Sequence, residues 1–116
     1  MKDNYKIQTI RIQGNDDVVG LLTTYQGYPN PKTMYITYLY INLEFQKQGF
    51  GQEVVYELLR ILKQNEYDEV RANVAMKNWS ALRFWTKLGL NKINGIFGDK
   101  EHSSDNYADV ELIMEL

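Results

Sequence analysis

The hydrophobic pattern of this chain predicts six strands and two helices. Apolar residues alternate with polar ones, or form short runs, over 5–13, 18–25, 34–41, 69–76, 90–97 and 108–116, as is typical of strands. Apolar residues recur every three to four positions over about 51–65 and 78–88, which is typical of helices packed against a sheet. The order strand-strand-strand-helix-strand-helix-strand-strand predicts an α/β domain with a mixed central β-sheet and two main helices.

Turn and cap residues mark the ends of these elements. The polar turn 14–17 joins the first two strands into a hairpin, and the Gly- and Pro-containing segment 27–31 ends the second strand. Asn78 is a natural N-cap for the second helix, and Gly89 stands where a C-terminal cap glycine is expected. The polar segment 98–106 is predicted to be a loop.

The strand 34–41 is apolar on both of its predicted faces. Strict alternation places three side chains on one face, Ile36, Tyr38 and Tyr40, and three on the other, Tyr35, Leu39 and Ile41. A mixed sheet normally has its apolar faces covered, so we expect something to pack on each side of this strand.

The segment 46–51, Gln-Lys-Gln-Gly-Phe-Gly, joins this apolar strand to the first helix. A strand that turns through two glycines into a helix leaves unpaired backbone N–H groups at the positive end of the helix dipole. Such a helix start is a site for phosphate or pyrophosphate. The alternative interpretation is a tight connection with no ligand.

Two familiar nucleotide-binding loops do not fit this segment. The chain has no Gly-x-x-x-x-Gly-Lys-Ser/Thr, and the dinucleotide fingerprint requires a third glycine where Val54 stands. The form here, Gln-x-x-Gly-x-Gly, resembles the acyl-coenzyme A loop of the GNAT superfamily of N-acetyltransferases. The segment 78–90, from Asn78 through Trp85 to Leu90, is similar to the second signature of that family.

The resemblance covers roughly residues 16–116, and it implies a single GNAT-like domain over 1–116. A full family domain begins with a strand and two helices, which wall the acceptor site and cover part of the sheet. The resemblance places the second strand of the family almost at Met1, so we expect these elements to be absent from this sequence. We therefore expect a homodimer whose contact replaces the missing helices.

Composition narrows the classes of function. The 116 residues include 13 basic and 15 acidic side chains, and a net charge of −2 provides no field that would recruit nucleic acid. The absence of cysteine excludes disulfides, thiolate metal sites and a cysteine nucleophile. No signal peptide or apolar run of membrane-spanning length is present, so we expect a cytoplasmic protein that does not bind membranes.

The resemblance implies a binding site for acetyl-CoA as cosubstrate, without a metal. The loop positions Gln46, Lys47, Gln48, Gly49, Phe50, Gly51 and Gln52 match the pyrophosphate loop, in which Gln46 replaces the commoner Arg. The strand end Leu39, Tyr40 and Ile41 matches the family strand that splays from its neighbour and binds the pantetheine arm. Asn78 matches a family residue that contacts this arm, or it serves only as the N-cap. Lys47 or Lys77 can add charge near a phosphate.

The catalytic residues are not identified by the sequence. Trp85 occupies the position of the family tyrosine that protonates the leaving thiolate, and an indole N–H is far too weak an acid for this role. Trp85 shares a helix face with Leu82 and Leu88, which favours core packing. His102, in the polar loop, is a weak candidate for the base, and Glu44 is expected to be solvated.

The sequence thus predicts an acyl-CoA-dependent N-acetyltransferase. The acceptor is expected to be a primary amine of a small molecule or peptide, acetylated by direct transfer. Two alternatives stay open: an acyl-CoA-binding module with little activity of its own, and a subunit that contributes a half-site to a partner.

Overall fold

The computed structural model describes residues 4–14, 17–98 and 108–116. One six-stranded sheet has the order β1-β2-β3-β4-β6-β5. Its strands are β1 Tyr5–Arg11, β2 Val18–Gln26, β3 Thr33–Ile41, β4 Glu69–Ala75, β5 Lys92–Gly98 and β6 Ala108–Glu115. β3 and β4 are parallel and all other neighbours are antiparallel, which confirms the mixed sheet.

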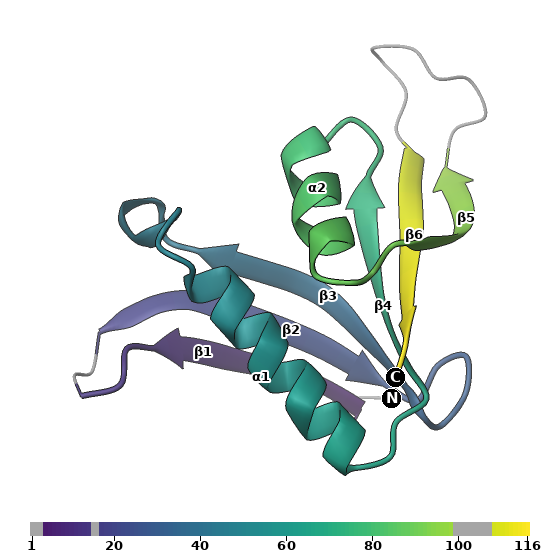
Figure 1. Ribbon diagram of the computed structural model, residues 1–116, viewed down its shortest axis with the longest axis horizontal. Coiled ribbons are helices and arrows are strands. Elements are labelled where there is room, and N and C mark those ends of the chain that lie inside the picture. Colours follow the sequence, from purple (N-terminus) through teal and green to yellow (C-terminus); the bar gives the residue numbers. More distant parts are fainter. Residues whose placement is uncertain (1–3, 15–16, 99–107) are drawn as a thin grey trace.

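Two helices connect the strands and lie on the same side of the sheet (Figure 1). α1, Phe50–Gln64, crosses from β3 to β4, and α2, Trp79–Lys87, follows β4. In α1 the buried residues Val55, Leu59 and Leu62 repeat at helical spacing, so one stripe of this helix faces the sheet.

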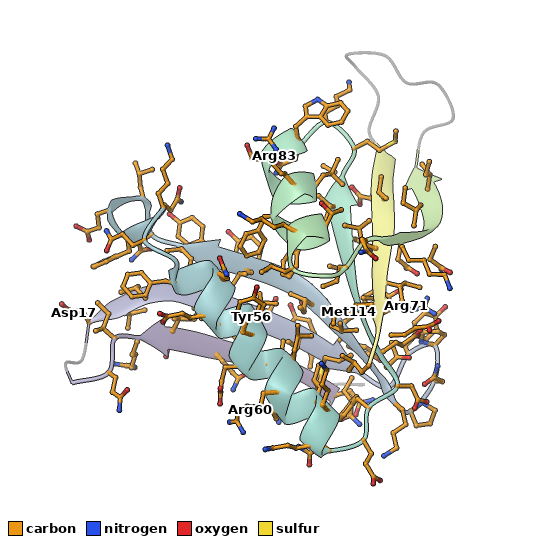
Figure 2. All side chains as sticks on the ribbon, viewed as in Figure 1. Asp17, Tyr56, Arg60, Arg71, Arg83 and Met114 are labelled. Carbon is orange, nitrogen blue, oxygen red and sulfur yellow. The ribbon has the colours of Figure 1, made fainter. Side chains whose placement is uncertain are left out.

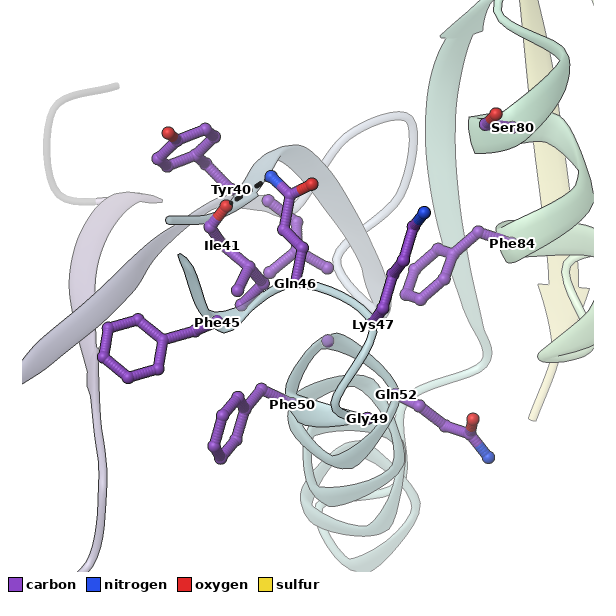
Figure 3. A pocket seen from close by; sticks show the side chains of 12 residues that line it. Tyr40, Ile41, Phe45, Gln46, Lys47, Gly49, Phe50, Gln52, Ser80 and Phe84 are labelled. Carbon is purple, nitrogen blue, oxygen red and sulfur yellow. Dashed lines mark hydrogen bonds between the residues drawn. The ribbon is translucent and has the colours of Figure 1, made fainter. Parts of the chain in front are cut away.

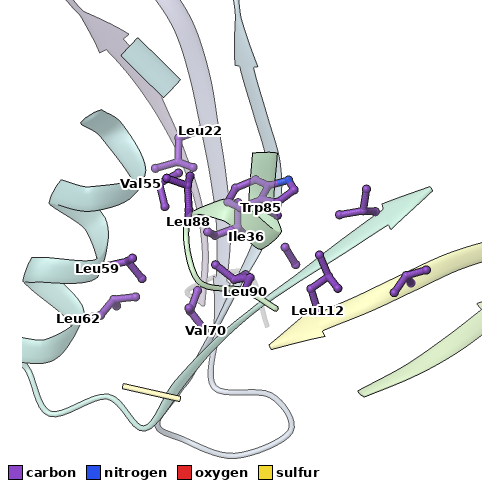
Figure 4. Packing of buried hydrophobic residues seen from close by; sticks show 13 residues of the cluster. Leu22, Ile36, Val55, Leu59, Leu62, Val70, Trp85, Leu88, Leu90 and Leu112 are labelled. Carbon is purple, nitrogen blue, oxygen red and sulfur yellow. The ribbon is translucent and has the colours of Figure 1, made fainter. Parts of the chain in front are cut away.

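The hydrophobic core lies between this side of the sheet and the helices. Leu22 of β2 and Ile36 of β3 belong to the same buried cluster as Leu59 of α1 and Trp85 of α2 (Figure 4). Burial of one such aliphatic side chain stabilises the fold by about 1.5–3 kcal/mol. The core therefore fixes both helices on one face.

The predicted caps of α2 are confirmed, and they explain a difference at β5. The Asn78 side chain accepts a hydrogen bond from the Ala81 backbone N–H at 3.1 Å. At the other end, Gly89 adopts φ 116° and donates to the carbonyl of Thr86, and Leu90 donates to that of Trp85. Because Leu90 takes part in this cap, β5 does not start at residue 90 as predicted but at residue 92.

The predicted faces of β3 are wrong beyond Ile36. Thr24 of β2 pairs with Ile36, but the adjacent Thr23 pairs with Tyr38, so β3 contains one extra residue, Thr37. This β-bulge breaks the alternation on which the prediction rests. Ile36 lies in the core on the helix side, whereas Tyr38 points to the opposite face and is exposed.

The sheet face opposite the helices carries exposed aromatic and aliphatic side chains over β1, β2 and β3. We call this surface the aromatic face, and it consists of Tyr5, Ile7, Leu21, Tyr38 and Tyr40. Within the described ranges no helix packs on it. The bulge turns Tyr38 and Tyr40 together to the side opposite Ile36, and their two rings stack with centroids 6.3 Å apart.

Candidate active site

β3 and β4 separate beyond the fourth pair of their shared ladder. Pairing runs from Thr33↔Glu69 to Ile36↔Ala72 and then stops, although β3 continues to residue 41 and β4 to residue 75. The two strands diverge in space past this point (Figure 1). Backbone groups of residues 37–41 that face β4 therefore have no partner strand and are available to a ligand.

A cavity of about 210 Å³ lies in this gap. β3 and β4 form its two sides through residues 36–39 and 72–75, and α2 contributes Ala81 and Trp85, with Asn78 at its start. The gap is thus closed on the helix side by α2.

The start of α1 has no side-chain cap. Gly49 occupies the N-cap position with φ 86°, and the first hydrogen bond of the helix runs from the Glu53 N–H to the Gly49 carbonyl at 3.0 Å. The preceding N–H groups, of residues 50–52, have no intrahelical acceptor. A Cβ atom at Gly49 would have no heavy atom within 4 Å, so the space in front of these donors is open. This arrangement suits an anion.

A second and larger cleft, of about 550 Å³, lies between this helix start and α2 (Figure 3). Its lining residues are Leu39, Tyr40, Ile41, Phe45, Gln46, Lys47, Gly49, Phe50, Gly51, Gln52, Ser80 and Phe84. The side chain of Lys47 extends across the cleft toward Phe84 of α2. In the described part of the chain Lys47 makes no ion pair, so its charge is available to an anionic ligand.

Two glutamine side chains hold the loop before α1 in place. Gln46 donates from Nε2 to the carbonyl oxygen of Ile41 at 2.7 Å, which ties the loop to the end of β3 (Figure 3). Gln48 donates from Nε2 to the carbonyl oxygen of Glu44 at 3.1 Å. The side chain of Gln46 therefore braces the site in this structure, at the position where the family more often has an arginine.

Most of the expected coenzyme-binding residues lie together. Nine of the eleven line the larger cleft, whereas Gln48 lies outside its lining and Asn78 lines the gap. Leu39 lines both cavities, so the cleft at α1 and the gap between the strands are neighbours. Sequence reasoning missed Phe45, Ser80 and Phe84. The i,i+4 spacing of Ser80 and Phe84 on α2 was the available signal for a shared face.

The sequence of this chain matches a known protein family. A model described as the Acetyltransferase (GNAT) family matches residues 3–90. The chain belongs to this GNAT family. No curated protein matches the sequence significantly.

Solved structures of other GNAT proteins share the fold. An IAA acetyltransferase from Bacillus cereus superposes with a TM-score of 0.79 at 18% identity, covering 98% of this chain and 79% of that one. A GNAT acetyltransferase from Elizabethkingia anophelis with acetyl-CoA bound gives 0.80 at 18% identity, with 99% and 78% covered. A Bacillus subtilis acetyltransferase in complex with CoA gives 0.78 at 18% identity, with 98% and 78% covered.

Of the two candidate catalytic positions, the structure describes Trp85 but not His102. Trp85, at the GNAT acid position, belongs to the hydrophobic core and packs edge-to-face on Phe84 at 5.0 Å. Asn78 acts as the N-cap and also lines the gap, so the two interpretations of this residue are compatible. His102 lies outside the described residues.

The described residues contain neither a candidate metal site nor a helix that could span a membrane. No group of three or more His, Asp or Glu side chains is placed to hold a metal ion among residues 4–14, 17–98 and 108–116. Neither helix in these ranges is long and apolar enough to cross a membrane.

Proposed function

We propose that this chain transfers an acetyl group from acetyl-CoA to a primary amine of a small molecule or peptide. The observation that carries the proposal is that the cleft at the uncapped start of α1 and the gap between β3 and β4 lie next to each other, with Leu39 lining both. A long cosubstrate with an anionic end and a reactive thioester end fits two such neighbouring cavities. Two similar solved structures contain acetyl-CoA or CoA, which supports this ligand.

The pyrophosphate would lie at the start of α1. The N–H groups of residues 50–52 would donate hydrogen bonds to it, and Lys47, which lines the same cleft, would supply a positive charge. Gly49 leaves the space in front of these donors empty, which allows the phosphate oxygens to approach the backbone.

The acyl end would lie in the gap, along the unpaired edge of residues 37–41. A backbone N–H in this position polarises the thioester carbonyl. The amine nitrogen, having lost a proton, bonds to the carbonyl carbon as the carbon–sulfur bond breaks, and the departing thiolate takes up a proton. Among the residues that line the gap, Tyr38 is the one with a phenol that can donate it, directly or through water.

Isothermal titration with acetyl-CoA tests the binding half of this proposal. Gly49→Glu places a carboxylate in front of the helix N–H groups, so we expect affinity to fall by about tenfold or more. Gly14→Glu is the matched control, because Gly14 also has a positive φ, 95°, and open space around its Cβ position. It should bind like the wild type. Equal affinities of the two variants, or no binding by the wild type, would refute the proposal.

The second candidate function is an acyl-CoA-binding module with little activity. Trp85 favours it, because the side chain at the family acid position is packed in the core. Release of free thiol from acetyl-CoA, measured with a panel of primary amines, separates the two. Amine-dependent release indicates a transferase, whereas tight binding without release from any amine indicates a binding module.

A further inference from the structure

Acetylation of a protonated amine releases one proton overall, because the thiolate takes up only one of the two protons that the nitrogen loses. A lysine-type amine has a pKa of about 10.4 and is therefore protonated near neutral pH. The gap between β3 and β4 is lined by four hydroxyl or amide side chains, Thr37, Tyr38, Asn73 and Asn78, and by no carboxylate or imidazole of the described residues. The proposed reaction therefore needs a path that carries a proton from the gap to water.

Thr37 stands where the two strands separate. It follows Ile36, the last residue of β3 that pairs with β4, and it lines the gap. Its Oγ1 atom lies 2.6 Å from the Oγ1 atom of Thr23 on β2. Because Thr23 pairs with the exposed Tyr38, this hydrogen bond lies on the side of the sheet opposite the helices. α2 closes the gap on the helix side, so the side that carries Thr37 is the one left for an acceptor.

The Tyr5 hydroxyl extends this pair of threonines to the surface. It hydrogen-bonds with both of them, and the bond with Thr23, followed by that with Thr37, lowers the pKa of Tyr5. A hydrogen bond lowers the pKa of a phenol when the phenol oxygen accepts it, so the threonine hydroxyls donate toward Tyr5. Tyr5 lies on the edge strand β1 and is 44% exposed. The three hydroxyls thus form a hydrogen-bonded path from the gap to water.

The groups that face Tyr5 on this side of the sheet carry no charge at neutral pH. The titratable ones are Tyr25 of β2, its pairing partner, and Tyr38 of β3. β2 and β3 contain no charged residue. In β1, Lys6 is adjacent to Tyr5 and so points to the opposite face, and Arg11 stands at the other end of the strand, roughly 20 Å away along it. A change in pH dependence on substitution of Tyr5 would therefore report on Tyr5 itself.

We infer that Thr37 and Tyr5 carry the proton of the acceptor amine out of the gap. The ammonium nitrogen gives a proton to Oγ1 of Thr37, the hydroxyl proton of Thr37 passes to the oxygen of Tyr5, and Tyr5 releases its own hydroxyl proton to water. The nitrogen lone pair freed in this way attacks the carbonyl carbon of the thioester. Thr23 holds the two hydroxyls in place. This inference rests on the proposed function.

Thiol release from acetyl-CoA, with the panel amine that reacts fastest, tests the path over a pH range that spans the pKa of that amine. Tyr5→Phe and Thr37→Val should lower kcat by about tenfold or more where the amine is protonated, and this deficit should shrink where the amine is already neutral. Thr37→Ser keeps the hydroxyl and should follow the wild type. Tyr56→Phe is the matched control, because it removes the same hydroxyl from a 50% exposed residue of α1, and it should follow the wild type at every pH.

An equal deficit at every pH overturns the inference, since a purely structural role would produce it, and so does wild-type kcat in both Tyr5→Phe and Thr37→Val. The double variant should be no slower than the slower single variant, because both residues act in one path, and additive losses would contradict this. Circular dichroism and acetyl-CoA titration check that each variant is folded and binds the cosubstrate. A wild type that releases thiol with no amine refutes the proposed function as well, whereas an active wild type matched by its variants refutes the path alone.

Discussion

Gly20 determines how closely β2 approaches the end of β3. Its pairing partner is Ile41, and a Cβ atom built on Gly20 would lie 2.0 Å from the carbonyl oxygen of Tyr40. That contact is with backbone, which a rotamer change cannot relieve. Tyr40 and Ile41 line the larger cleft, so any substitution at Gly20 must displace a wall of the site.

We predict that Gly20→Ala lowers the free energy of unfolding by about 1–3 kcal/mol, as overpacking does, and also weakens acetyl-CoA binding. Gly51→Ala is the control, because a Cβ there would lie 3.4 Å from the Phe84 ring, an ordinary contact. In a helix this change should leave stability unchanged or raise it by about 0.5–1 kcal/mol. Urea unfolding measures the stability of both variants, and titration with acetyl-CoA measures the binding by Gly20→Ala. Equal effects of the two substitutions on stability would contradict the prediction.

At the scale of elements, a polar network ties four strands together at the paired end of the sheet. Glu111 of β6 is buried and accepts hydrogen bonds from Tyr35 of β3, from Arg71 of β4 at 2.7 Å and from Asn94 of β5 at 2.7 Å. Arg71 also bonds to Glu69 at 2.8 Å, and Figure 2 shows its position beside β6. Charge-assisted bonds of this kind offset the desolvation of the buried carboxylate.

This network predicts a loss of stability at high pH. Burial, and secondarily the hydrogen bond to Glu111, raises the pKa of Tyr35 to about 12 from 10.0. The folded state therefore keeps the Tyr35 proton where the unfolded chain has lost it. The stability that this difference provides is complete below about pH 10 and is lost as the pH rises toward 12.

Urea unfolding from pH 8 to pH 11.5 measures this decline. Tyr35→Phe should make it shallower, and at neutral pH it should lower the free energy of unfolding by about 1 kcal/mol through the lost hydrogen bond. Tyr56→Phe, at an exposed position on α1 (Figure 2), is the control and should leave the decline as it is in the wild type. An unchanged decline in Tyr35→Phe would exclude this tyrosine as its cause.

At the scale of the whole molecule, the sheet consists of two halves. β1, β2 and β3 carry α1, and β4, β5 and β6 carry α2 (Figure 1). Only four residue pairs join β3 to β4, and the halves diverge beyond them. The radius of gyration is 14.8 Å, against about 13 Å for a compact domain of this length. The two halves are thus joined through the short β3–β4 ladder.

Because the proposed cosubstrate spans the halves, its binding should protect backbone amides on both sides of the cleft. We predict slower hydrogen exchange over 37–41 and 46–52 when acetyl-CoA is added. Residues 92–96 of β5 lie outside both cavities and serve as the internal control, with no change expected. Protection confined to 46–52 would mean that the ligand does not enter the gap between the strands.

The sequence by itself determined the features that depend on neighbours a few residues apart. The caps at Asn78 and Gly89 follow from local backbone chemistry, and the apolar stripe of α1 follows from helical spacing. The glycine loop predicted an open helix start for the same reason, since a side chain at Gly49 would stand before the free N–H groups. Element order and most element boundaries were accessible in this way.

Only the tertiary structure decided the features that depend on how distant strands pair. The bulge at Thr37 is defined by register against β2, and it determines that Tyr38 and Tyr40 lie on the exposed face while Ile36 lies in the core on the other side. The end of the β3–β4 ladder at Ile36, and the placement of Phe84 across the cleft from α1, are likewise relations between segments far apart in sequence. One inserted residue reverses every later side chain of a strand, and the local hydrophobic pattern of β3, apolar on both faces, is the same with or without it.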